Sequence, residues 1–201
     1  MRYFLVLLLL ISPSVAFGHG GGLDSDGGHT NRKTGAYHYH KKVAQYDRNE
    51  YGRWRDVDRD CQNTRHEVLI GSSAESVQFK TEKQCLVVSG LWIGLYTGNI
   101  FSNARQLDID HVVPLKEAHI SGASGWTKEM KRQCANDEDN LLAVSRSANR
   151  SKGERDPAQW MPKNEAFHCE YIKKWVAVKE KVILYMDRNE QQKINSVLAG
   201  C

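Results

Sequence analysis

Hydrophobic and polar positions along this chain follow a two-residue period in some segments and a helical period in others. The two-residue alternation predicts strands at residues 77–80, 86–89, 107–110 and 141–144. Turns are expected at Ser89-Gly90 and at Tyr96-Thr97-Gly98. The helical period predicts helices at residues 60–70, 115–120, 127–135, 147–152, 164–186 and 187–198. The resulting fold class is α+β, with most of its helix near the C-terminal end.

The longest predicted helix begins at Asn164, which we expect to cap it, and reaches about Met186. Its apolar residues recur with helical spacing, which is typical of a helix that packs one face on a core. They are Phe167, Ile172, Trp175, Val176, Val182 and Ile183. We interpret them as core residues and not as part of a cofactor site.

The first sixteen residues have the pattern of a secretory signal peptide. Arg2 precedes an apolar run at residues 3–11, and Ser14-Val15-Ala16 is a small-x-small cleavage site. The run is too short to cross a bilayer, and no later segment approaches about 20 apolar residues. We therefore expect an exported protein without a membrane span, either secreted or periplasmic.

Composition divides the remainder into three parts: a Gly/His-rich segment at residues 17–45, a linker of mixed charge at residues 46–59, and one domain at residues 60–201. In the first part, His29, His38 and His40 have the residue type that zinc or copper sites use. This segment also resembles the short YHYH modules of exported bacterial proteins. A solvated linker and a small second metal site both remain open for it.

Five cysteines in an exported chain favour two disulfides and one free thiol. No pair has CxxC spacing, which argues against a zinc ribbon. We predict the disulfides Cys61–Cys85 and Cys169–Cys201, because each closes one local unit, and each would contribute roughly 3–4 kcal/mol. Cys134 then remains free, as a small buried residue on a helix.

The net charge of +4 permits a nucleic-acid partner but does not argue for one. Residues 105–155, which hold the candidate chemistry, have nine Lys or Arg and eight Asp or Glu. Affinity for a polyanion must therefore come from the placement of individual cations.

The segment from Asp108 to Gly153 concentrates groups suited to phosphodiester chemistry. Asp110-His111 ends one predicted strand, Asn140 precedes the next, and Asn149-Arg150-Ser151-Lys152 lies on the following helix. This order and spacing resembles the HNH (ββα-metal) endonuclease family, with asparagine where histidine is commonest at the third position. The resemblance extends more loosely over residues 60–201 and looks like exported bacterial HNH proteins. It implies an HNH core with added N-terminal strands and a helical C-terminal part.

The resemblance also implies a metal ion and a base. Asp110 and the side-chain carbonyl of Asn149 would supply two oxygen ligands to Mg²⁺, with Mn²⁺ or another divalent ion as alternatives. His111 would act as the general base, because an ordinary imidazole pKa near 6.5 suits proton transfer at neutral pH.

Three further residues complete the expected site. Asn140 would bind backbone across the loop between the strands and hold the turn at His111. Arg150 and Lys152 would bind substrate phosphate near the helix N-terminus. Asp108 would face away from Asp110 or orient a neighbour.

Each residue has a structural alternative when it is taken alone. A histidine after a strand is usually structural, Asn149 could cap a helix, and Arg150 with Lys152 could be a solvated pair. Only their order and spacing together favour catalysis. His119 and His168 lie outside the motif, and we expect structural roles for both.

The sequence thus predicts an exported, monomeric, metal-dependent endonuclease that hydrolyses DNA, and RNA as a second candidate substrate, with little sequence specificity. One rival hypothesis is a histidine-rich metal-binding protein with an inactive HNH scaffold. Another is a delivered toxin, which would require an inhibitor protein as its partner.

Overall fold

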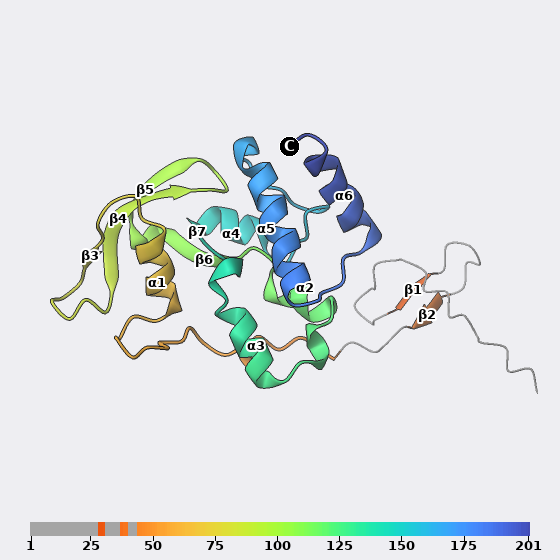
Figure 1. The fold of residues 1–201 in the computed structure, drawn as a ribbon, viewed down its shortest axis with the longest axis horizontal. Coiled ribbons are helices and arrows are strands. Elements are labelled where there is room, and N and C mark those ends of the chain that lie inside the picture. The colour runs from red at the N-terminus through yellow and green to blue at the C-terminus, as the bar shows by residue number, and fades with distance from the viewer. Residues whose placement is uncertain (1–27, 31–36, 40–43) are drawn as a thin grey trace, which may run out of the picture.

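The computed structural model describes residues 28–30, 37–39 and 44–201 (Figure 1). The expected signal peptide at residues 1–16 and His40 lie outside these ranges. Within them, no helix combines the length and apolar character that crossing a membrane requires.

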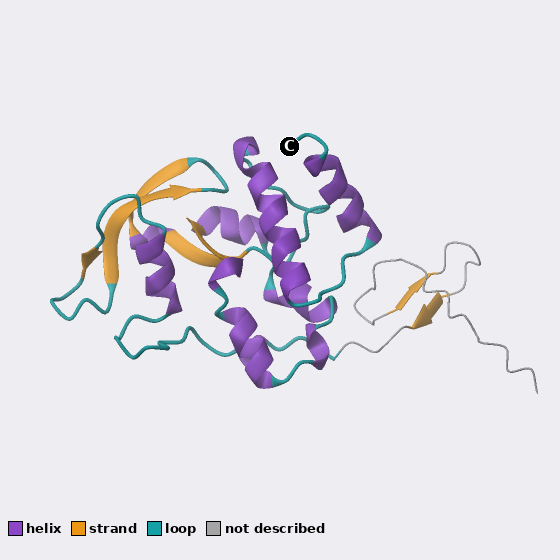
Figure 2. Cartoon of the chain, in the orientation of Figure 1, coloured by secondary structure: helices purple, strands orange, loops and turns teal. Residues whose placement is uncertain are grey.

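Seven strands and six α-helices make up the regular structure of the described residues (Figure 2). The strands are β1 (Gly28–Thr30), β2 (Tyr37–Tyr39), β3 (Gln78–Phe79), β4 (Val87–Gly94), β5 (Asn99–Asn103), β6 (Leu107–His111) and β7 (Leu141–Ser145). The helices are α1 (Thr64–Gly71), α2 (Leu115–Ile120), α3 (Lys128–Ala135), α4 (Arg146–Lys152), α5 (His168–Lys181) and α6 (Arg188–Leu198). This mixture agrees with the predicted α+β class.

Strands β3, β4 and β5 form an antiparallel sheet in that order, at the left of Figure 1. The turn predicted at Ser89-Gly90 is wrong, because β4 continues through it with a shift of register before Trp92. The turn at Tyr96-Thr97-Gly98 is confirmed, and Gly98 has a φ of +74° there. It leads into β5, which the sequence pattern did not predict.

Strands β6 and β7 form a separate antiparallel pair, and α4 follows β7 without a loop. The register sets Asp110 opposite Leu142 and His111 opposite Leu141. Ser145, the last residue of β7, caps α4 by accepting a hydrogen bond from the Ala148 backbone N–H at 3.2 Å. The two strands and the helix are therefore one continuous unit with a fixed relative orientation.

Most of the predicted helices are confirmed with small changes at their ends. Thr127 caps α3, and Asp187 begins α6 with a capping box that also uses Glu190. The longest helix is shorter than predicted: it ends at Lys181, and Asn164 makes no side-chain cap. Ile183 lies beyond this end with a 91% exposed side chain, so its assignment to the core was wrong.

Two main clusters of buried residues lie on either side of the β6–β7 pair. One joins α5 to the strand ends and includes Trp175, Tyr171 and Tyr96, whereas the other joins α1 to the strands through Leu69 and Trp92. Figure 2 shows the corresponding division, with strands β3 to β5 at the left and helices α5 and α6 farther right. The β6–β7 pair therefore has apolar support from both parts.

Residues 46–59, which composition indicated to be a linker, are part of the folded domain. Tyr51, in the 3-10 turn Arg48–Tyr51, is fully buried against Leu115, Cys134 and Ala135. No pattern in the sequence indicated this anchor, because a single buried residue among charged neighbours produces no hydrophobic period.

The two predicted disulfides are present. Cys61 and Cys85 join the start of α1 to the β3–β4 loop, and Cys169 and Cys201 join α5 to the C-terminus. Cys134 is free and buried on α3, as expected.

Burial raises the pKa of the Cys134 thiol to about 11. In the native protein at mildly alkaline pH, we therefore expect no alkylation by iodoacetamide, because the reactive thiolate is scarce and shielded. Unfolding without a reductant should add a single adduct, at Cys134, detected by mass spectrometry of the digest. Rapid native labelling, or adducts on other cysteines before reduction, would contradict both the burial and the pairing.

Candidate functional site

The end of β6 and the helix α4 bring three of the predicted site residues to one open pocket of about 440 Å³. Asp110 and His111 reach it from β6, and Asn149 reaches it from α4. Trp54 and Arg48 form part of the opposite wall, although neither was predicted to belong to the site. The other three predicted residues, Asn140, Arg150 and Lys152, do not line this pocket.

Asp110 is a buried carboxylate with three hydrogen bonds. Lys152 Nζ lies 3.1 Å from Oδ1 and 2.8 Å from Oδ2, and the Tyr96 hydroxyl donates to Oδ2 at 2.7 Å. Burial raises the pKa of Asp110, while the neighbouring ammonium and the phenol oppose the rise. A carboxylate has about four lone-pair positions, so one on Oδ1 remains for another donor or an ion.

Lys152 does not lie where the phosphate-binding prediction requires. Its side chain is fully buried, and Nζ also donates to the His111 carbonyl oxygen at 2.7 Å. The ammonium therefore holds the end of β6 and has no path to a substrate phosphate. Arg150 is exposed, but it lies in the last turn of α4. The sequence had predicted a position near the N-terminus of the helix.

His111 is held by its ring nitrogen Nε2, which lies 2.9 Å from the Ala135 carbonyl oxygen. Because a carbonyl can only accept, Nε2 carries the proton and Nδ1 is left with a free lone pair. The ring also stacks on Trp54, with centroids 5.5 Å apart and planes 13° apart. Burial lowers the pKa of His111 to about 4, so the imidazole is neutral at physiological pH.

Asn140 spans the loop between the strands, as the sequence predicted. Its side chain accepts from the Val113 N–H at 2.8 Å and donates to the Val113 carbonyl at 3.1 Å. Its backbone carbonyl accepts from Val112 N–H at 2.8 Å. These three bonds fix the chain just after His111, so Asn140 is a positioning residue.

Asn149 is oriented by Asp108, which faces the same helix as Asp110 and not away from it. The Asn149 Nδ2 group donates to Asp108 Oδ2 at 3.1 Å, and Arg146 Nε donates to Asp108 Oδ1 at 3.3 Å. Because its amide nitrogen is used in this way, Asn149 has its carbonyl oxygen left to accept or to bind an ion. Asp108 is thus the neighbour-orienting residue that the sequence suggested as an alternative.

His119 and His168 do not line the pocket. His119 is buried between Tyr51 and the Ala44 carbonyl, and His168 Nε2 donates to the Pro162 carbonyl at 2.7 Å, so both have structural contacts. In the N-terminal segment, β1 and β2 pair so that His29 lies opposite His38.

Two residues that contact the site, Tyr96 and Trp54, were not predicted from the sequence. Tyr96 lies fourteen residues before its partner Asp110, in a turn. Trp54 lies in a stretch read as a linker, although an aromatic residue between Arg53 and Arg55 is a pattern common in nucleic-acid-binding segments.

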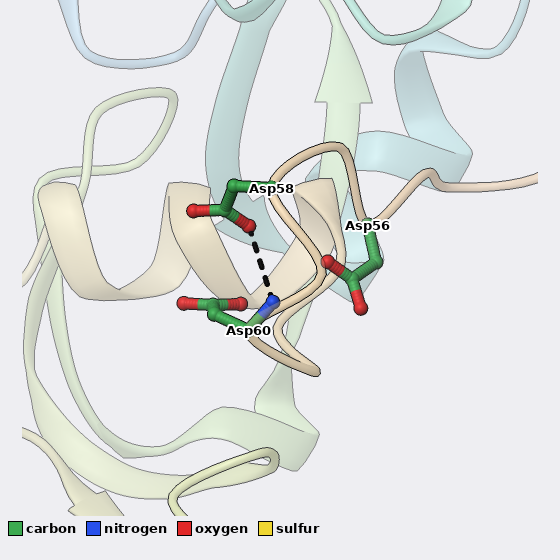
Figure 3. A group of neighbouring side chains, drawn as sticks. All are labelled: Asp56, Asp58 and Asp60. Carbon is green, nitrogen blue, oxygen red and sulfur yellow. Dashed lines mark hydrogen bonds between the residues drawn. The ribbon is translucent and has the colours of Figure 1, made fainter.

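An acidic cluster lies outside the pocket, in the loop before α1. Figure 3 shows Asp56, Asp58 and Asp60 with their carboxylates near one another and the Asp60 N–H directed at Asp58. All three are exposed. Exposed acidic groups often gather without an ion, so we assign no metal to this cluster.

Removal of the Lys152 charge should destabilise the protein strongly, because it leaves the Asp110 carboxylate buried without its ion pair. For Lys152→Met, which preserves most of the volume, we expect a loss of about 3–5 kcal/mol in the free energy of unfolding. Chemical denaturation with intact disulfides measures it. The matched control is Lys116→Met, which removes an exposed 2.7 Å pair with Glu154 and should change stability by about 1 kcal/mol or less. Equal losses in the two variants would refute the structural role of Lys152.

Comparison with known proteins adds a family to this geometry. Residues 72–196 match the model of the C-terminal domain of GmrSD restriction endonucleases. An uncharacterized secreted protein of the fungus Arthroderma benhamiae is 34% identical over 158 residues, which cover 78% of this chain and 76% of the relative. No solved structure matches. Since the family model matches more than half of the length of this chain, the chain belongs to the family of GmrSD restriction endonuclease C-terminal domains.

Proposed function

We propose that this protein is a metal-dependent endonuclease of the HNH (ββα-metal) type that hydrolyses the phosphodiester bonds of DNA. Membership of a restriction-endonuclease family supports a nuclease. The observation that carries the finer proposal is the state of His111, whose Nε2 is bound to the Ala135 carbonyl while its ring lines the same pocket as Asp110 and Asn149.

In the proposed reaction, His111 Nδ1 takes a proton from a water molecule in the pocket. The water oxygen attacks the phosphorus atom, the bond to the 3′ oxygen breaks, and that oxygen takes a proton from solvent. The low pKa of His111 keeps Nδ1 free of a proton at neutral pH, although it also makes the ring a weaker base. Stacking on Trp54 and the bond to Ala135 fix the direction in which Nδ1 accepts.

The donor set fits a hard divalent ion. Asp110 has an unused lone pair on Oδ1, Asn149 has an unused carbonyl oxygen, and both line one pocket. Magnesium prefers such oxygen ligands and retains several waters, so two protein ligands suffice. A bound ion would stabilise negative charge on the phosphate and on the departing oxygen. Lys152 favours the ionised form of the Asp110 carboxylate and so opposes the effect of burial on its pKa.

The compartment that we propose is outside the cytoplasm. The two disulfides and the secreted relative fit secretion. Sequence specificity is expected to be low, because the proposed contacts are to phosphate and phosphate contacts carry no sequence information.

A second candidate function is the histidine-rich metal-binding protein with an inactive scaffold. The antiparallel pairing of β1 with β2, whose backbone register sets His29 opposite His38, favours it. An inactive scaffold would leave DNA intact with every divalent metal, so one assay separates the two functions.

We expect the purified protein to nick supercoiled plasmid with Mg²⁺ or Mn²⁺ and to lose this activity in EDTA. His111→Ala should lower the cleavage rate by about 10²–10⁴-fold, because it removes the proton acceptor. Gel electrophoresis of a time course measures both effects.

The matched control is His168→Ala, which also removes an imidazole bound through Nε2 to a backbone carbonyl but lies outside the pocket. Its rate should stay within a few-fold of the wild type. A His111→Ala variant that cleaves at the wild-type rate would exclude the proposed mechanism.

A further inference from the structure

A second open pocket adjoins the candidate site along the segment that precedes α1. It has a volume of about 450 Å³, and its walls come from residues 49–55 and from α3. Trp54 lines both this pocket and the one that holds His111, so a single indole separates the two. We call it the arginine pocket, because Arg53, Arg55 and Arg132 line it.

The segment that forms the arginine pocket is anchored at both ends. Tyr51 is fully buried in a small core with Leu115 and Cys134, and Trp54 stacks on His111. Gly52 lies between these anchors with a φ of +69°, and a Cβ there would come within 3.1 Å of Arg132 Cγ. The glycine thus lets the Arg132 side chain lie against the segment, which holds the pocket in a defined shape.

Two of the arginines are available to a ligand. Arg55 is paired with Glu129 at 3.1 Å, which neutralises one positive and one negative charge. Arg53 and Arg132 are exposed, and their guanidinium groups have no ion pair or hydrogen bond with any residue that the structure describes. Arg48, on the wall of the neighbouring pocket, adds a third cation, with Nη1 donating to the Gly52 carbonyl at 2.8 Å. The acidic cluster begins one residue after Arg55 and limits the positive surface on that side.

We propose that the arginine pocket binds a backbone phosphate of the nucleic-acid strand, next to the phosphate that is cleaved. The planar guanidinium of arginine suits phosphate oxygens, to which it can donate two parallel hydrogen bonds. Residues 105–155 are close to neutral overall, so phosphate binding depends on where individual cations are placed. Arg53 and Arg132 supply them. This inference rests on the proposed function, because it names how that same site holds its substrate.

The test measures binding separately from cleavage. A fluorescently labelled DNA duplex is titrated with protein in EDTA, and the anisotropy gives the association constant at several NaCl concentrations. Each phosphate contact contributes roughly 0.9 to the slope of log K against log salt. The double variant Arg53→Ala/Arg132→Ala should therefore bind more weakly and lower the magnitude of the slope by about two.

The matched control is Arg105→Ala/Arg188→Ala, which removes the same charge from two exposed arginines outside both pockets. It should keep the wild-type slope. In the cleavage assay with metal, the Arg53/Arg132 double variant should raise KM and keep most of kcat, because it removes binding that is equal in the ground and transition states.

The outcomes separate this inference from the proposed function. If wild-type protein cleaves DNA but the double variant keeps the wild-type slope and KM, the arginine pocket is not a phosphate site. If the wild type fails to cleave with any divalent metal but the slope falls by about two in the double variant, the phosphate site stands and the nuclease proposal fails. If the salt slope and the affinity fall equally in the control and in the double variant, the effect comes from net charge alone, and the inference is wrong.

Discussion

The buried ion pair between Lys152 and Asp110 is the interaction on which the site depends. A carboxylate and an ammonium removed from water must compensate each other, and loss of either leaves a charge that the interior cannot solvate. Here the pair joins the last turn of α4 to strand β6, and Lys152 also binds the carbonyl of His111. One side chain therefore fixes both the acid and the backbone of the histidine.

This pair is held in place from the C-terminal side of the molecule. The hydroxyl of Tyr96 donates to Asp110, and its ring packs at the edges of Trp160 and Tyr171. Tyr171 in turn belongs to α5, which a disulfide joins to the C-terminus through Cys169. Burial raises the pKa of Tyr96 well above its ordinary value, so it remains a hydroxyl donor. Helix α5, acting through Tyr171 and Tyr96, thus helps to orient the Asp110 carboxylate on β6.

Local patterns predicted the elements, and long-range contacts decided the roles of the residues. The caps at Thr127 and Asp187 and the strand at 107–110 depend on neighbours within a few positions, which the sequence displays. Strand β5 was missed because exposed and half-exposed residues leave it no alternation. Lysine is rarely buried, so Lys152 was interpreted as a phosphate ligand, and its true partner lies 42 residues away. Residues 46–59 were interpreted as a linker, since Tyr51 and Trp54 are anchored only by contacts across the fold.

The proposed mechanism requires Asp110 and Asn149 to hold one divalent ion beside His111. Crystals soaked in Mn²⁺ and measured for anomalous scattering test it directly. We expect one difference peak within about 2.3 Å of an Asp110 oxygen and the Asn149 carbonyl oxygen, close to the oxygen-ligand distances of small hard cations. A peak confined to Asp56, Asp58 and Asp60, with Asp110 bound only to Lys152 and Tyr96, would contradict it.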